Sequence, residues 1–103
     1  MKELIKVLYF KINEEPELLE IENDLSALQK LVGGYIQVVP LKSDLYLICN
    51  ETGRLDNLQY QERYNIYGDF LVAKALGDEL TTFDEILARR VLKEIDDLLN
   101  ILL

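Results

Sequence analysis

The sequence contains no histidine and a single cysteine, Cys49. The absence of histidine removes the commonest general base and the commonest metal ligand, and it excludes serine–histidine and cysteine–histidine nucleophile pairs. One cysteine can form neither an internal disulfide nor a cysteine-based metal cluster. Because Cys49 lies in a hydrophobic stretch with no basic neighbour to activate it, we expect a structural thiol. The chain is therefore predicted to be no enzyme and to use no metal or cofactor.

Long apolar runs are also absent. No run approaches the roughly 20 residues of a membrane-spanning helix, and the first residues lack the apolar segment of a signal peptide. We therefore expect a cytoplasmic protein that does not contact a membrane. With 103 residues, half of them hydrophobic, the chain is expected to form one domain over residues 1–103 with a modest core.

Basic residues are few: 11 lysines and arginines stand against 19 aspartates and glutamates, which gives a formal net charge of −8. This balance argues against direct nucleic-acid binding, which needs basic side chains to neutralise phosphates. It suits an acidic surface that docks on a basic partner. Solubility alone explains the same charge, and the sequence leaves both interpretations open.

The spacing of apolar residues predicts an α+β fold. Period-2 alternation indicates a central strand over residues 4–12 and an edge strand over 19–22. Residues 55–67 fit either a short helix or an irregular loop. Further strands are expected over 35–39, 45–50 and 70–76, the last of these ending the sheet. We predict a mainly antiparallel sheet of four to five strands, with one short helix and one long C-terminal helix packed on one face.

Capping residues place these two helices. The first is expected to begin at Asn23 as N-cap and to end at Gly33, where a left-handed C-cap residue belongs. Residues Thr82–Glu85 form a capping box, which predicts the long helix from Phe83 to about Leu102. Apolar side chains nearly surround its final turn, so either the fold or a second chain covers it. We therefore expect a homodimer through this helix.

Three motifs follow one another along the chain: Val-Gly-Gly-Tyr-Ile at residues 32–36, Leu-Ile-Cys-Asn-Glu at 47–51 and Tyr-Gly-Asp at 67–69. This order resembles a family of small phage and mobile-element proteins that is known as a domain of unknown function. The loop before Tyr-Gly-Asp departs from the family pattern, because it is longer and lacks proline. The resemblance implies a phage, prophage or conjugative-element setting, and it supplies no activity, cofactor or catalytic residue.

One candidate surface combines carboxylates with tyrosines. Carboxylates spaced along a surface can imitate phosphates, and tyrosine is enriched at protein interfaces. The predicted partner-binding residues are Glu14, Glu15, Glu17, Glu20, Tyr60, Tyr64 and Tyr67. A solvated acidic face and tyrosines that cover the sheet are the plain structural alternatives.

A second candidate site lies at the predicted strand ends. Its ligand-binding residues would be Gly34, Asn50, Glu51, Arg54 and Asp69. Turn formation explains most of these residue types equally well. An anionic ligand there would also need a basic side chain such as Arg54, Lys42 or Arg63. Acid–base catalysis by Glu51 and Asp69 ranks last.

Two functional hypotheses follow. The first is a non-enzymatic, acidic protein from a phage or mobile element, which binds and inhibits or modulates a host defence or nucleic-acid-processing protein with a basic surface. This setting comes from the resemblance, and the acidic docking surface comes from the residues. The alternative is a protein that binds and sequesters a small ligand or nucleotide.

Overall fold

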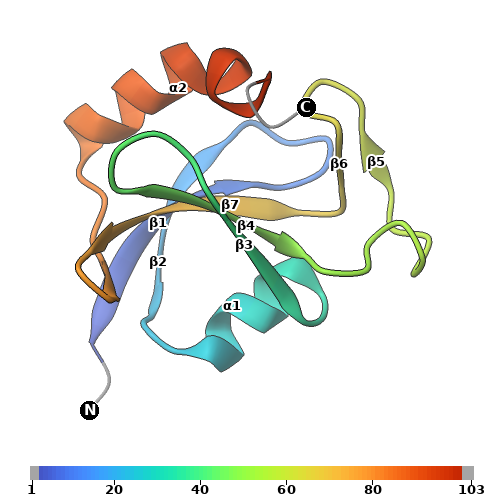
Figure 1. Cartoon of the computed structure of the whole chain (residues 1–103), viewed down its shortest axis with the longest axis horizontal. Helices are drawn as coiled ribbons and strands as arrows, with labels where there is room; N and C mark the ends of the chain where they lie inside the picture. Colours follow the sequence, from blue (N-terminus) through green and yellow to red (C-terminus); the bar gives the residue numbers. More distant parts are fainter. Residues whose placement is uncertain (1–2, 101–103) are drawn as a thin grey trace.

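A computed structural model describes residues 3–100 of the chain. Its main sheet is antiparallel, and its principal strands lie in the order β2-β1-β7-β4-β3 (Figure 1). The strands are β1 (Leu4–Phe10), β2 (Glu17–Glu22), β3 (Ile36–Pro40), β4 (Leu45–Asn50) and β7 (Phe70–Leu76). A short strand β8 (Glu79–Thr81) pairs with β7, and β5 (Tyr60–Gln61) and β6 (Ile66–Tyr67) form a separate hairpin. The helices are α1 (Leu25–Val32) and α2 (Glu85–Asn100). The predicted α+β class is confirmed.

The two helices cover opposite faces of the sheet (Figure 1). Val72 packs in the cluster that contains α2, whereas its neighbours Leu71 and Ala73 pack in the cluster that contains α1. The expectation that both helices lie on one face is wrong. The reason is the composition of β7: Phe70 and the three residues after it are each 0% exposed, so both faces of this strand must be covered.

The positions of β1 and β2 agree with the alternation in the sequence. β1 lies between β2 and β7, as expected of a strand with apolar residues on both faces. β2 is an edge strand whose register places Glu17 opposite Tyr9 and Glu20 opposite Lys6. Because side chains alternate along a strand, these two glutamates leave the edge from opposite faces.

Both helix starts differ from the expectation. Asp24 rather than Asn23 caps α1, accepting the amide of Ala27 at 2.7 Å, while the Asn23 side chain donates to the Leu80 carbonyl. At α2, Asp84 accepts the amide of Leu87 at 2.7 Å. Gly33 is the left-handed C-cap of α1 (φ 75°), as predicted. In each corrected case an aspartate one or two residues after the expected cap takes the capping role.

Thr82 has a role other than the predicted cap. Its hydroxyl accepts the backbone amide of Lys6, and the Phe83 amide donates to the Lys6 carbonyl. These bonds fasten the start of α2 to β1. The capping box therefore marked the helix boundary, but Thr82 is used for a tertiary contact.

Two further segments concern the predicted secondary structure: one differs from the prediction, and the other settles a segment that the sequence leaves open. β7 is not the last strand, because Gly77 adopts a left-handed φ of 65° and turns the chain back into β8. The ambiguous segment 55–67 consists of turns and the β5–β6 hairpin rather than a helix. Three strand bounds also shift slightly, since β1 ends at Phe10, β2 begins at Glu17 and β3 spans Ile36–Pro40.

The apolar end of α2 is covered by the chain itself over the described residues. Leu98 and Leu99 are 5% and 3% exposed and belong to the core cluster on the α2 face. The rest of the predicted dimer contact, Ile101–Leu103, lies outside the described residues. The homodimer stays a prediction. Over residues 3–100, neither helix has the length and apolarity needed to cross a membrane.

Candidate functional site

Asn50 joins the end of β4 to the end of α1. This side chain is 6% exposed, its Nδ2 donates to the Val32 carbonyl at 3.0 Å, and its Oδ1 accepts the Thr52 amide at 2.8 Å. Gly34 lies directly against it, since a Cβ at this position would be 2.9 Å from Nδ2. Gly34 and Asn50, two of the five predicted ligand-binding residues, are thus in contact inside the fold, an arrangement that we call the lock. The side-chain amide of Asn50 is already occupied by hydrogen bonds to the backbone.

Asp69 forms a second internal connection. Its carboxylate accepts the Tyr9 hydroxyl and the Ile12 amide, each at 2.9 Å. Burial raises the pKa of Tyr9, and the adjacent Asp69 carboxylate raises it further because a phenolate there would be repelled and would lose the hydrogen bond. Asp69 therefore fastens the end of β1 to the β6–β7 connection.

The other two residues of the strand-end set, Glu51 and Arg54, are exposed. A cavity of about 200 Å³ beside Gly33 is lined by Asp69 and by one cation, Lys30, whereas Arg54 does not line it. The structure gathers Gly34, Asn50 and Asp69 near this joint but supplies little positive charge for an anion. Ligand binding at this set stays a prediction.

The tyrosine hairpin β5–β6 is fastened to the end of β1, just before the β1–β2 connection that carries Glu14 and Glu15, which we call the acidic turn. The Nε2 of Gln61 donates to the Phe10 carbonyl at 3.2 Å and to the Gly68 carbonyl at 2.7 Å. Burial raises the pKa of Tyr64, the Arg63 guanidinium lowers it, and the carboxylates of Asp96 and Glu15 raise it, Glu15 by the least. The hairpin therefore packs on β1, and Glu15 lies within electrostatic range of it.

The three predicted tyrosines have different surroundings. Tyr64 is 9% exposed and packs edge-on against Phe10 and Phe70, with ring centroids 5.2 Å apart in both pairs. Tyr60 is 40% exposed, and its ring lies 4.8 Å from that of the half-buried Tyr67. Tyr64 thus belongs to the core on the α2 face, whereas the Tyr60–Tyr67 pair is accessible.

The four predicted carboxylates are all exposed: Glu14, Glu15, Glu17 and Glu20. Glu14 forms an ion pair with Lys11 at 3.3 Å, and both side chains are more than half exposed. Arg63 of the hairpin forms a 3.4 Å ion pair with Asp96 of α2, which also raises the pKa of Arg63. Exposed pairs of this kind contribute little to stability. The edge carboxylates remain available to a partner.

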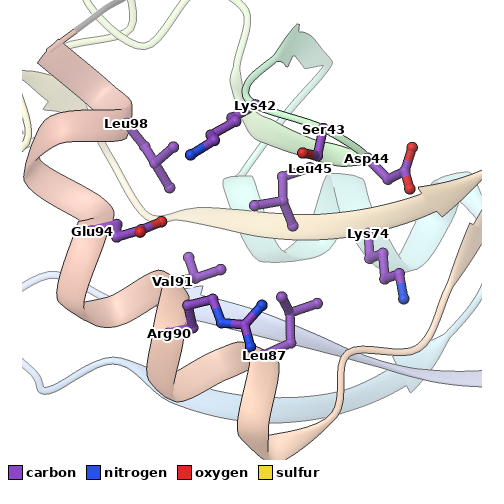
Figure 2. Close-up of a pocket in the computed structure, with 10 residues that line it drawn as sticks. All are labelled: Lys42, Ser43, Asp44, Leu45, Lys74, Leu87, Arg90, Val91, Glu94 and Leu98. Atoms are coloured by element: carbon purple, nitrogen blue, oxygen red, sulfur yellow. The ribbon is translucent and has the colours of Figure 1, made fainter.

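A cleft between α2 and the sheet was not predicted from the sequence (Figure 2). Its volume is about 280 Å³. Three basic side chains from different elements line it: Lys42 of the β3–β4 loop, Lys74 of β7 and Arg90 of α2. Buried Leu45 and Val91 contribute to its apolar lining. The sequence carried no signal for this site, because the three cations are far apart along the chain and meet only when α2 packs across β7 and β4.

Cys49 is half-buried, and burial raises the pKa of its thiol. A raised pKa lowers the fraction of reactive thiolate at neutral pH. This environment is that of a packing residue rather than of a nucleophile.

The lock between Gly34 and Asn50 can be tested with a double-mutant cycle. Gly34→Ala should destabilise the protein by about 1–3 kcal/mol, because the new methyl group displaces a buried amide from its hydrogen bond. In an Asn50→Ala background the same change should be neutral or slightly stabilising, since alanine then only restricts the unfolded chain. Urea unfolding of the four proteins measures this. Additive costs would contradict the lock.

The bond between Tyr9 and Asp69 predicts a pH dependence. Tyr9→Phe should cost about 1–2 kcal/mol near pH 7, where one hydrogen bond is lost. The folded pKa of Tyr9 is raised, so its contribution is complete below the unfolded pKa of about 10 and is lost as the pH rises toward the folded pKa. Urea unfolding should therefore show the gap between the two proteins shrinking at about pH 11. A gap that stays constant would show that Tyr9 does not titrate in this way.

Comparison with protein-family models gives a match to a domain of unknown function, DUF3846, over residues 5–96. Comparisons with curated proteins and with solved structures give no match. The matched range begins in β1 and ends within α2, so it includes both faces of the sheet and all candidate site residues except Leu98 of the cleft. The chain belongs to the DUF3846 family of domains of unknown function.

Proposed function

We propose that this protein is a non-enzymatic binding protein that docks on the basic surface of another protein through the acidic edge of its sheet. The docking surface consists of Glu14, Glu15, Glu17, Glu20 and the Tyr60–Tyr67 pair, which we call the acidic edge surface. In the setting implied by the family resemblance, the partner is a host defence or nucleic-acid-processing protein in the host cytoplasm. Binding would inhibit or modulate that partner.

The observation that carries this proposal is the junction of the acidic turn with the tyrosine hairpin. The two segments are distant in the sequence, yet Gln61 of the hairpin bonds to the Phe10 carbonyl at the end of β1, four residues before Glu14. The accessible rings of the hairpin and the exposed carboxylates of the neighbouring edge would together provide contact area and charge complementarity. This combination is typical of a protein interface rather than of a plain solvated face.

The register of β2 defines the shape of the negative surface. Glu17 and Glu20 leave the edge strand from opposite faces, and Glu14 and Glu15 lie in the turn that leads into it. The negative charge therefore follows the rim of the sheet. A partner with a basic groove could enclose such a rim, as it would a phosphate backbone, whereas a flat basic surface would meet only some of these carboxylates.

Tyr64 contributes indirectly to this surface. Its ring packs on Phe10 and Phe70, which fixes the hairpin against the sheet. Tyr60, which is 40% exposed, then supplies the contact area. Tyr60→Ala should accordingly weaken partner binding with little loss of stability, whereas replacement of Tyr64 should disturb the core.

Charge reversal tests the proposal. The triple variant Glu15→Lys, Glu17→Lys, Glu20→Lys should bind its partner about tenfold or more weakly and with a flatter salt dependence. Tagged wild-type and variant proteins are used for capture from a bacterial lysate at low and high salt, and the captured proteins are identified by mass spectrometry. Affinity for the dominant captured protein is then measured with purified components.

A matched control separates local from overall charge. The triple variant Asp44→Lys, Asp78→Lys, Glu79→Lys changes the net charge by the same amount at three other exposed positions. It should retain most of the wild-type affinity. Equal loss in both variants would mean that only net charge matters. Wild-type affinity in the acidic-edge variant would show that this surface is not the interface.

A further inference from the structure

We infer that the cleft between α2 and the β3–β4 loop binds a small phosphate monoester that carries an apolar or aromatic group. The cleft lies on the side of α2 that faces β4, whereas Arg89 and Leu92 line a hollow on the other side of the helix, next to Leu18 of β2. The site is therefore separate from the acidic edge surface, and the inference does not depend on the proposed protein partner. The small ligand would therefore bind in this cleft and not at the strand-end residues predicted from the sequence.

Charge identifies the ligand as an anion. Three of the 11 basic side chains of an acidic chain line this one cleft: Lys42, Lys74 and Arg90. Over residues 3–100, none of the three forms an ion pair or a side-chain hydrogen bond. The carboxylates of Asp44 and Glu94 also line the cleft, so its lining carries a net charge of +1 within a chain of −8, and this local positive charge attracts an anion.

The positions of the charged groups favour a phosphate monoester. Two carboxylates also line the cleft, and the Glu94 carboxylate lies between α2 and the β3–β4 loop, whereas the side chains of Asp44 and Lys74 point away from α2 (Figure 2). The Lys42 ammonium and the Arg90 guanidinium are therefore the cations that a ligand in the cleft would meet. A phosphate monoester carries about −1.5 to −2 at neutral pH and three acceptor oxygens, which suits two cations better than the single charge of a carboxylate.

The geometry separates a charged part from an apolar part. The Lys42 ammonium extends from its loop toward α2, and the Arg90 guanidinium extends from α2 toward the sheet (Figure 2). A guanidinium can bind phosphate through two parallel hydrogen bonds, and an ammonium adds a mobile point charge. The buried side chains of Leu45, Val91 and Leu98 provide an apolar surface beside them.

The size of the cleft limits the ligand. Its volume of about 280 Å³ is at the lower end of the range for small-molecule sites. Phenyl phosphate is the minimal probe, because it combines one phosphate with one aromatic ring, and adenosine 5′-monophosphate is the larger probe. Inorganic phosphate and phenol each represent one half of the minimal probe.

Isothermal titration of the full chain tests the site. Phenyl phosphate or adenosine 5′-monophosphate should bind at least about tenfold more tightly than inorganic phosphate or phenol. Arg90→Gln should weaken that binding by about tenfold, since one charge-assisted bidentate contact is lost. Arg90 is exposed, so circular dichroism should show an intact fold. Lys42→Gln, in the loop, provides an independent second variant with the same expected direction.

Arg89→Gln is the matched control, because it removes the same charge from the other side of α2. It should leave the affinity within about twofold of wild type. The inference is overturned if neither ester binds up to about 10 mM. It is equally overturned if inorganic phosphate binds as tightly as both esters, or if Arg89→Gln weakens binding as much as Arg90→Gln.

Discussion

Strand β7 must be buried on both faces, and the rest of the fold depends on this constraint. Phe70, Leu71, Val72 and Ala73 are each 0% exposed, so no face of this strand can be left to solvent. β1 and β4 flank it, α1 covers one face and α2 covers the other. The constraint explains how a chain of 103 residues forms two apolar clusters instead of one.

The two faces carry different kinds of polar structure. Near the end of α1, Asn50 has hydrogen bonds to the backbone, and Asp69 has hydrogen bonds to Tyr9 and to the Ile12 amide. These bonds connect β4 to α1 and the β6–β7 connection to β1. Near α2, three basic side chains line a cleft together with two carboxylates, and none of the three cations forms an ion pair or a side-chain hydrogen bond among the described residues. Satisfied buried polar groups specify a fold, whereas cations without a partner favour a ligand. This difference separates the structural polar residues from the candidate functional ones.

Local patterns predicted the elements well but could not predict how they associate. Period-2 alternation placed β1, and the left-handed Gly33 ended α1, because both signals act over a few residues. Polar residues close together in the sequence compete for one cap, so Asn23 and Thr82 were predicted as caps where Asp24 and Asp84 provide them. The cleft was not predictable, since its cations come from three elements that meet only through tertiary packing.

The molecule places an acidic edge on one side of α2 and a cleft lined by three cations on the other. The most direct test is a map of backbone amide chemical shifts while the full chain is titrated with phenyl phosphate. Shifts should cluster at 42–45, around Lys74 and at 87–98, and the acidic edge from Glu14 to Glu20 should stay unchanged. Shifts centred on Asn50, Glu51 and Asp69, or spread along the acidic edge, would contradict this separation of the two surfaces.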